Sequence, residues 1–245
     1  MSTTSKDGAK SKKGKKSKKG DGWKSNLLTI GGALILAIFI RITLFEAFAI
    51  DGPSMEPTLL DGDRVVVAKY PFGLFLPFTH EAMFNWGGPD PGDVIILHSP
   101  ADNEDIVKRV IGVGGDEILI RGGKIYRNGE VLETLEVGPC LRDEQKNIDS
   151  SCMIYEETVD GVAHRMSHSK HDFPLDRLPV RIPEGHVYVL GDHRDSSNDS
   201  RNPLIGAVEN SRIKGKALFI YMSSKNARDA LWNRIRWSRV GSNVN

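Results

Sequence analysis

The stretch at residues 52–67, GPSMEPTLLDGDRVVV, places one serine between two prolines and leads directly into a β-branched run. Pro53 fixes its own φ angle, and Pro57 restricts the residue before it to extended conformations, so Ser54 lies on a backbone with few alternatives. A stiff backbone suits the presentation of a nucleophile. A proline-rich turn with an ordinary structural serine explains the same residues. The stretch alone therefore leaves both interpretations open.

Beyond this stretch, short apolar runs indicate strands. The runs are rich in Val and Ile and are bounded by Gly, Asp or Pro, which is typical of a β-dominated fold. Residues 124–132 are typical of a hairpin closed by Asn128 and Gly129 in a type I′ turn. We therefore expect a mainly β fold, with further strands at 63–70, 92–98, 105–113, 116–120, 185–191 and 212–222.

Between residues 132 and 181 the sequence becomes polar and we expect irregular structure. This change in composition predicts an inserted subdomain at residues 118–185. The catalytic core would then consist of two separate segments, residues 46–117 and residues 186–240.

The only two cysteines, Cys140 and Cys152, lie within the expected insertion. In a domain outside the cytoplasm, a cysteine pair in a loop-rich region favours a disulfide. Two buried free thiols are the alternative.

The N-terminal region carries most of the positive charge. Residues 1–24 contain nine lysines and two aspartates, whereas the whole chain has a net charge of only +1. Such a polybasic, low-complexity tail is predicted to be disordered. A nucleic-acid-binding arm is the rival interpretation, and we expect no nucleic-acid partner because an apolar segment follows directly.

That apolar segment predicts a membrane anchor. Residues 27–40 are uncharged for 14 positions, short of the roughly 20 needed to cross a bilayer. Extending the segment to residues 25–45 reaches the required length, with Arg41 extending its head group to the interface. The lysines then place the N-terminus in the cytoplasm and the folded domain outside, in a single-pass arrangement with a lipid bilayer as partner.

A cleaved signal peptide is the main competitor of the anchor. A lysine-rich region, an apolar core and the small-residue pattern at 47–49 follow in the order of such a peptide. We favour a retained anchor because Arg41 and Glu46 interrupt the run before the cleavage site. Cleavage would also leave Ser54 close to a mobile terminus.

Lys108 lies in an expected strand. Alternation places it on the same face as Ile106 and Val110, so an ammonium group meets an apolar surface. Burial disfavours the charged form and lowers the pKa of a lysine, which makes the neutral amine a competent general base. The alternative is a lysine whose stem packs on an edge strand while its head reaches water.

Three blocks, in this order, resemble those of the type I signal peptidases, membrane-bound serine proteases that remove signal peptides from exported proteins. The blocks are SMEPTLLDGD at 54–63, KRVIGVGGD at 108–116 and GDHRDSSNDSR at 191–201. The resemblance covers most of the chain beyond residue 45. It implies a bacterial cytoplasmic membrane location, a β-rich core with a variable insertion, and cleavage of secretory precursors after Ala-x-Ala sites.

The resemblance also implies a catalytic dyad of Ser54 as nucleophile and Lys108 as general base. In the third block it implies that Ser197 hydrogen-bonds to the amine of Lys108. Asp199 and Arg201 match motif positions that suggest an ion pair fixing the loop.

One position departs from the family. Many members have a serine two residues before the nucleophile, whose hydroxyl helps to bind the oxyanion, but this chain has Gly52. Either the backbone N–H of Gly52 acts beside that of Ser54, or the oxyanion hole has fewer donors.

Four residues match positions that line the family's substrate pockets. A signal peptide could add as a strand beside them, with shallow pockets for small side chains. For each of these residues ordinary core packing is the alternative. They are Ile50, Met55, Ile106 and Val107.

Other patterns support no cofactor and no metal. The spacing of His164, His168 and His171 suits a metal site, but no Cys or carboxylate pattern accompanies it. Residues 231–237, rich in Trp and Arg, are typical either of a lipid-interface segment or of a patch packed on the core. Two other functions remain as alternatives, a self-cleaving repressor-type peptidase and a catalytically silent, membrane-tethered binding module.

Overall fold

The computed structural model describes residues 21–75, 82–85, 87–141, 148–169, 176–224 and 235–244 of the 245-residue chain. The chain divides into two compact units, Met1–Phe39 and Ile40–Asn245. The second unit contains the described strands and all of the candidate site residues.

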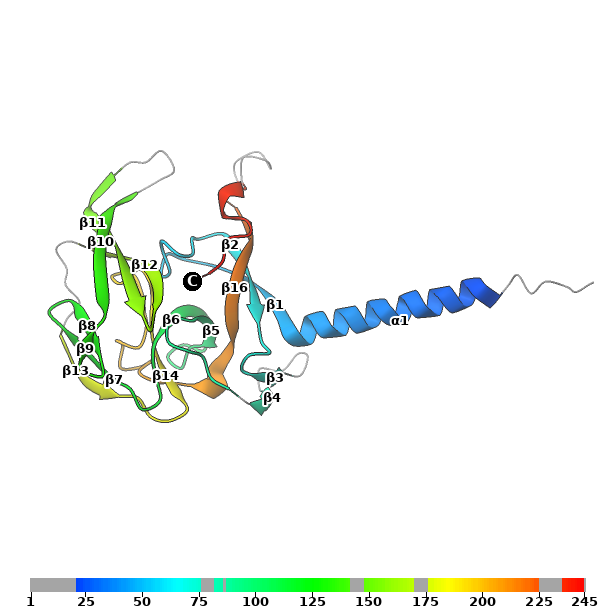
Figure 1. The fold of residues 1–245 in the computed structure, drawn as a ribbon, viewed down its shortest axis with the longest axis horizontal. Coiled ribbons are helices and arrows are strands. Elements are labelled where there is room, and N and C mark those ends of the chain that lie inside the picture. The colour runs from blue at the N-terminus through cyan, green and yellow to red at the C-terminus, as the bar shows by residue number, and fades with distance from the viewer. Residues whose placement is uncertain are drawn as a thin grey trace, which may run out of the picture. The chain divides into compact units, whose positions relative to one another are not determined.

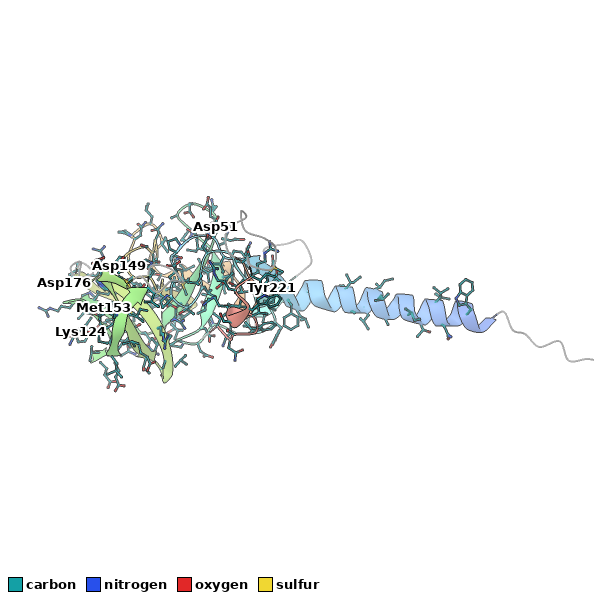
Figure 2. The ribbon with its side chains drawn as sticks, turned by 90° about the horizontal axis from the view of Figure 1, so that it is seen from above. Asp51, Lys124, Asp149, Met153, Asp176 and Tyr221 are labelled. Atoms are coloured by element: carbon teal, nitrogen blue, oxygen red, sulfur yellow. A yellow bond between two sulfur atoms is a disulfide. The ribbon has the colours of Figure 1, made fainter. Side chains whose placement is uncertain are left out.

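Helix α1 (Asp21–Leu44) forms where the anchor was expected. Many of its apolar side chains are exposed, Leu28 by 78% and Ile35 by 71%, and they project from the helix in Figure 2. Within the described residues, however, no helix is both long enough and apolar enough to cross a membrane. The prediction of a spanning helix at residues 25–45 is therefore not confirmed.

The largest sheet has seven strands, and each neighbouring pair is antiparallel (Figure 1). Val and Ile dominate its central strands, which are buried on both faces, as expected for a core sheet. In spatial order the strands are β1 (Phe45–Ala49), β2 (Asp63–Ala68), β16 (Ile213–Ser223), β5 (Val94–His98), β6 (Asp105–Val113), β14 (His186–Leu190) and β15 (Val208–Glu209). This sheet confirms the prediction of a mainly β fold.

Three smaller sheets accompany the large one. Two of them use strands between residues 117 and 181, and the boundaries of the inserted subdomain remain a prediction. Their spatial orders are β10 (Glu133–Leu141), β11 (Ile148–Val159), β12 (Val162–Ser169); β13 (Arg177–Arg181), β7 (Glu117–Arg121), β8 (Lys124–Arg127), β9 (Glu130–Val131); and β3 (Gly73–Phe75), β4 (Ala82–Asn85). Short 3-10 helices occur at Asn210–Arg212 and Trp237–Arg239.

Two-residue turns with positive φ angles close two hairpins of the smaller sheets. Asn128 and Gly129 both have positive φ angles, 54° and 84°, which the predicted hairpin turn requires. Asp160 and Gly161 do the same between β11 and β12, at 52° and 80°. The prediction of irregular structure over residues 132–181 is wrong, because the Asp-Gly signal was missed and strand β10 is mostly exposed, without the alternation of a half-buried strand.

Apolar side chains from the two smaller sheets share a core with the large sheet. One buried cluster joins Ile111 and Leu190 of the large sheet to Ile118, Ile125 and Val159 of strands β7, β8 and β11. Burial of this shared surface stabilises the attachment of the smaller sheets to the strands that carry the site.

Candidate active site

Ser54 lies in a tight loop between β1 and β2, here called the serine loop (residues 50–62). The ends of this loop are joined by backbone hydrogen bonds, from Ile50 N to Asp63 O at 2.8 Å and from Gly62 N to Ile50 O at 3.1 Å. Directly around Ser54, the N–H of Glu56 donates to Pro53 O at 3.0 Å. The serine is therefore held on a short, closed turn, as its flanking prolines predict.

Lys108 meets Ser54 across this turn. Its Nζ lies 2.9 Å from Ser54 Oγ and 2.9 Å from Val107 O, and the residue is only 3% exposed. Burial lowers the pKa of Lys108 to about 8, although Asp199 and Asp192 act in the opposite direction. A substantial fraction of this lysine is therefore neutral near pH 8, and a neutral amine beside a hydroxyl can accept its proton.

The segment at residues 191–201, here called the 191–201 loop, packs against the backbone of Ser54. The N–H of His193 donates to Ser54 O at 3.1 Å. At Gly191, an added Cβ would lie 2.4 Å from Ser54 O and 2.2 Å from Ser197 Oγ. This close approach explains why a glycine occupies position 191.

An ion pair fixes the 191–201 loop. The guanidinium of Arg201 donates through Nε and Nη2 to the buried carboxylate of Asp199, both at 2.8 Å. The same carboxylate accepts the N–H of Gly191 at 3.0 Å. Asp199 and Arg201 thus form the pair that the resemblance implied, and the pair acts on the glycine beside Ser54.

Ser197 differs from expectation. Among the described residues its Oγ has no hydrogen-bond partner, although it is buried. The expected bond to Lys108 is not formed, because the lysine Nζ donates to Ser54 and Val107 while the Ser197 side chain packs beside Gly191.

Gly52 also differs from expectation. Its backbone N–H donates to Asp61 Oδ1 at 3.2 Å, so this donor is already used within the serine loop. The expected role of Gly52 as an oxyanion donor is therefore not supported by this conformation. The Ser54 N–H makes no hydrogen bond within the described part of the chain. This N–H is therefore available to donate to an oxyanion formed at Ser54.

Three of the four expected pocket residues come together. Ile50, Met55 and Val107 belong to one buried cluster beneath the serine loop, and none is more than 7% exposed. Ile106 instead packs with Val110 in a second cluster. Successive side chains of a strand point to opposite faces, so Ile106 and Val107 cannot line the same pocket.

Strand β6 has an open edge next to Lys108. On one side, residues 105–109 pair with β5, and on the other side only residues 109–113 pair with β14. In the described part of the chain, no strand pairs with the remaining edge at residues 105–108. An extended peptide could therefore add there by main-chain hydrogen bonds.

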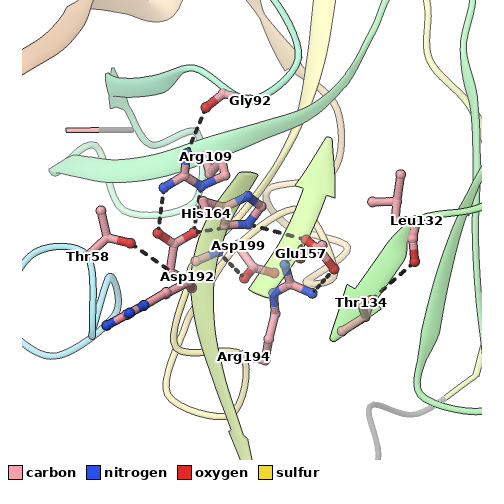
Figure 3. Close-up of polar contacts among 12 residues, drawn as sticks. Thr58, Gly92, Arg109, Leu132, Thr134, Glu157, His164, Asp192, Arg194 and Asp199 are labelled. Carbon is pink, nitrogen blue, oxygen red and sulfur yellow. Dashed lines mark hydrogen bonds and ion pairs between the residues drawn. The ribbon is translucent and has the colours of Figure 1, made fainter. Parts of the chain in front are cut away.

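A buried network of charges lies beside this site (Figure 3). Arg109, the neighbour of Lys108, donates to both carboxylate oxygens of Asp192 at 2.8 Å and to Gly92 O at 2.7 Å. Neither Arg109 nor Asp192 was predicted from the sequence as a site residue. Arg109 directly follows Lys108, and Asp192 directly follows Gly191, in the sequence blocks. This proximity is the signal that could have identified them as site residues.

The network extends into strands β11 and β12. Glu157 pairs with Arg194, and His164 Nε2 lies 3.3 Å from Glu157 Oε2 and 3.9 Å from Asp192 Oδ1. Burial alone would raise the pKa of Glu157, but the Arg194 guanidinium and His164 hold it at about 2. No sequence pattern indicated this pair, because both charges are buried only by tertiary packing.

Strand β12 also contacts the serine loop directly. Ser167 Oγ donates to Glu56 O at 3.1 Å, and Thr58 Oγ1 donates to Arg165 O at 3.2 Å. The backbone of Ser167 also forms a parallel bridge with His193 of the 191–201 loop. The predicted insertion therefore supports both loops that meet at Ser54.

The remaining predicted residues have other roles in the fold. Cys140 and Cys152 form a disulfide between β10 and β11, with Cα atoms 5.3 Å apart. His164 is part of the charge network, and His171 lies outside the described residues. Within the described residues no cluster of three or more His, Cys, Asp or Glu side chains suits a metal ion. Of residues 231–237 only the last three are described.

Comparisons with known proteins bear on the chemistry of this site. Residues 23–222 match the family described as "Signal peptidase, peptidase S26". Signal peptidase I of Pseudomonas aeruginosa is 33% identical over 220 residues, which cover 85% of this chain and 75% of the relative. The corresponding protein of Rickettsia bellii is 31% identical over 227 residues, covering 83% and 73%, and that of Bacillus licheniformis 30% over 196 residues, covering 80% and 87%.

Proposed function

We propose, because the chain belongs to the signal peptidase family, peptidase S26, that it is a serine endopeptidase that removes N-terminal signal peptides from exported precursor proteins. The observation that carries the proposal is the contact of Lys108 Nζ with Ser54 Oγ at 2.9 Å. This is hydrogen-bond distance for a nucleophile and its base.

Ser54 and Lys108 divide the chemistry between them. Ser54 Oγ attacks the scissile carbonyl carbon while the neutral amine of Lys108 accepts the hydroxyl proton. The resulting ammonium donates that proton to the leaving amine, and the acyl-enzyme remains. A water molecule activated by the same lysine then hydrolyses the ester and regenerates Ser54.

The Ser54 N–H stabilises the developing oxyanion in this proposal. The Gly52 N–H is bonded to Asp61, so a second donor requires a rearrangement of the serine loop or a group brought by the substrate. Loss of one oxyanion donor typically costs about 10²- to 10³-fold in turnover, which concerns the rate and not the type of reaction.

Substrate recognition follows from the open edge of β6. The end of a signal peptide adds as a strand beside residues 105–108, which brings its scissile bond to the dyad. Ile50, Met55 and Val107 are already buried, so they leave only shallow depressions for side chains. Small residues such as the alanines of an Ala-x-Ala site fit this surface.

Helix α1 attaches the enzyme to the bacterial cytoplasmic membrane in this proposal. Its exposed apolar side chains support the attachment. The lysines of residues 1–24 support a cytoplasmic N-terminus and an extracytoplasmic catalytic domain. Alkaline carbonate extraction of membranes tests the attachment. Recovery of the intact protein in the soluble fraction would contradict it.

Cleavage of a secretory precursor in detergent tests the proposed activity. The purified wild type is compared with Ser54→Ala and Lys108→Ala. We expect cleavage after an Ala-x-Ala site by the wild type and by neither variant. If the folded wild type is inactive with lipid supplied, the membrane-tethered binding module becomes the better interpretation.

A further inference from the structure

The C-terminal segment (residues 235–244) lies along strand β16 of the large sheet. Ile235 forms a β-bridge with Ser224, and Asn243 forms another with Phe219. These two contacts lie near opposite ends of the segment. They fix it beside the part of β16 that pairs with the first half of β2, directly after the serine loop.

Asp63 connects this segment to the serine loop. It is the first residue of β2 and is fully buried. Its carboxylate accepts from Arg239 Nη2 at 2.5 Å and Nε at 3.1 Å, and from Ser223 Oγ at 2.5 Å. It also accepts the N–H of Leu60 at 2.9 Å. A buried carboxylate requires such partners, so Arg239 secures the base of the serine loop.

The same arginine reaches further into the loop. Arg239 Nη2 donates to Thr58 O at 2.8 Å, four residues beyond Ser54. Arg236 Nη1 donates to Asp61 O at 3.0 Å. Two guanidinium groups from the C-terminal segment thus hold two carbonyls of the serine loop. The Asp63 carboxylate in turn fixes the guanidinium of Arg239.

Val244, near the end of the segment, is buried in the apolar cluster of Ile50, Met55 and Val107. The segment therefore also closes the apolar surface beneath Ser54. Arg236 and Arg239 are directed into the protein, so these two side chains bind the serine loop and are not free for contact with lipid.

We propose that the C-terminal segment positions the catalytic serine and that Arg239 is the positioning residue, which acts through Asp63 and the Thr58 carbonyl to hold Ser54 against Lys108. This inference rests on the proposed function, because it concerns turnover by the same dyad. It assigns a role in the reaction to residues that lie beyond the three sequence blocks.

Two substitutions of Arg239 in the full-length protein test the inference. Arg239→Lys keeps a positive charge for Asp63 but lacks the fork that reaches the carboxylate and Thr58 O together. Arg239→Gln removes the charge as well. The matched control is Arg64→Gln, which removes an exposed arginine next to Asp63 in β2.

We expect Arg239→Lys to lower kcat by about 10- to 100-fold, because a small displacement of a nucleophile lowers the reaction rate by a factor of this order. KM should change little, since the open edge of β6 is untouched. The midpoint of the pH–rate profile should also stay, because burial, Asp199 and Asp192, which have the largest effects on the pKa of Lys108, do not involve the C-terminal segment. Arg64→Gln should match the wild type in all three measurements.

The outcomes are distinguishable. Wild-type kcat in Arg239→Lys, or an equal loss in Arg64→Gln, overturns the positioning role while the proposed function stands. A rise in KM at constant kcat also overturns it. An inactive wild type overturns the proposed function and this inference with it. If Arg239→Gln fails to fold, the lysine variant decides the question, because it retains the charge that Asp63 needs.

Discussion

Lys108 Nζ lies 2.9 Å from Ser54 Oγ and donates at the same distance to Val107 O, the carbonyl of the preceding residue in the strand. The backbone carbonyl holds the amine in place, and within the described residues no carboxylate forms an ion pair with it. Burial can therefore lower the pKa of the lysine while its position remains fixed.

Activity should rise with pH through about 8. The folded pKa of Lys108 is lowered to about 8 by burial, and only the neutral amine can accept the Ser54 proton. We expect kcat/KM measured between pH 6 and pH 10 to increase about tenfold per unit below the midpoint and then to level off. A profile that is flat across pH 8 would contradict the role of Lys108.

The stability of the fold should depend on Glu157. Glu157→Gln leaves the buried guanidinium of Arg194 without its charged partner, and breaking a buried pair costs about 3 to 5 kcal/mol. Urea unfolding at pH 7 measures this loss. Glu133→Gln, at an exposed position of strand β10, is the control and should lose little.

The same pair predicts a specific acid sensitivity. The pKa of Glu157 is about 2 in the folded state, below its value in the unfolded chain, so its stabilisation is present above the unfolded pKa and is lost as the pH falls toward 2. Unfolding free energies measured from pH 6 to pH 3 should therefore fall less in Glu157→Gln than in the wild type. Parallel curves for the two proteins would count against the assignment.

Gly191→Ala should impair turnover. The new Cβ would meet Ser54 O and Ser197 Oγ, so the serine or the 191–201 loop must move. We expect kcat to fall by about 10²-fold, the usual order for a misplaced reacting group. Gly32→Ala, where an added Cβ meets no atom within 4 Å, is the control and should retain activity. Unchanged activity of Gly191→Ala would show that the close contact is not needed.

Substitutions of Gly52 should separate strain from catalysis. Its φ angle of +90° is unfavourable for other residues, although an added Cβ meets no atom within 4 Å. Gly52→Ala and Gly52→Ser should each lose about 1 to 2 kcal/mol of unfolding free energy. Only the serine variant carries a new oxyanion donor, so its kcat should exceed that of the alanine variant. Equal kcat values would show that the hydroxyl does not reach the oxyanion.

Much of the site could be predicted from local patterns. The prolines around Ser54, the alternation around Lys108 and the Asn128-Gly129 turn are properties of a few consecutive residues. Local chain geometry therefore determines them before any distant contact forms. The block around Asp199 and Arg201 likewise brings both members of an ion pair within three residues.

Tertiary structure alone decided the rest. The bond from Gly52 N to Asp61, the direction of the Ser197 side chain and the burial of Glu157 beside Arg194 depend on which segments meet in the folded chain. Strand β10 has almost no buried side chain, so its place in a sheet rests on backbone pairing with β11. The sequence by itself determined the reacting groups and the strands near them. Tertiary packing determined which donors and charges face them, because a buried polar group takes the partner that long-range packing brings to it.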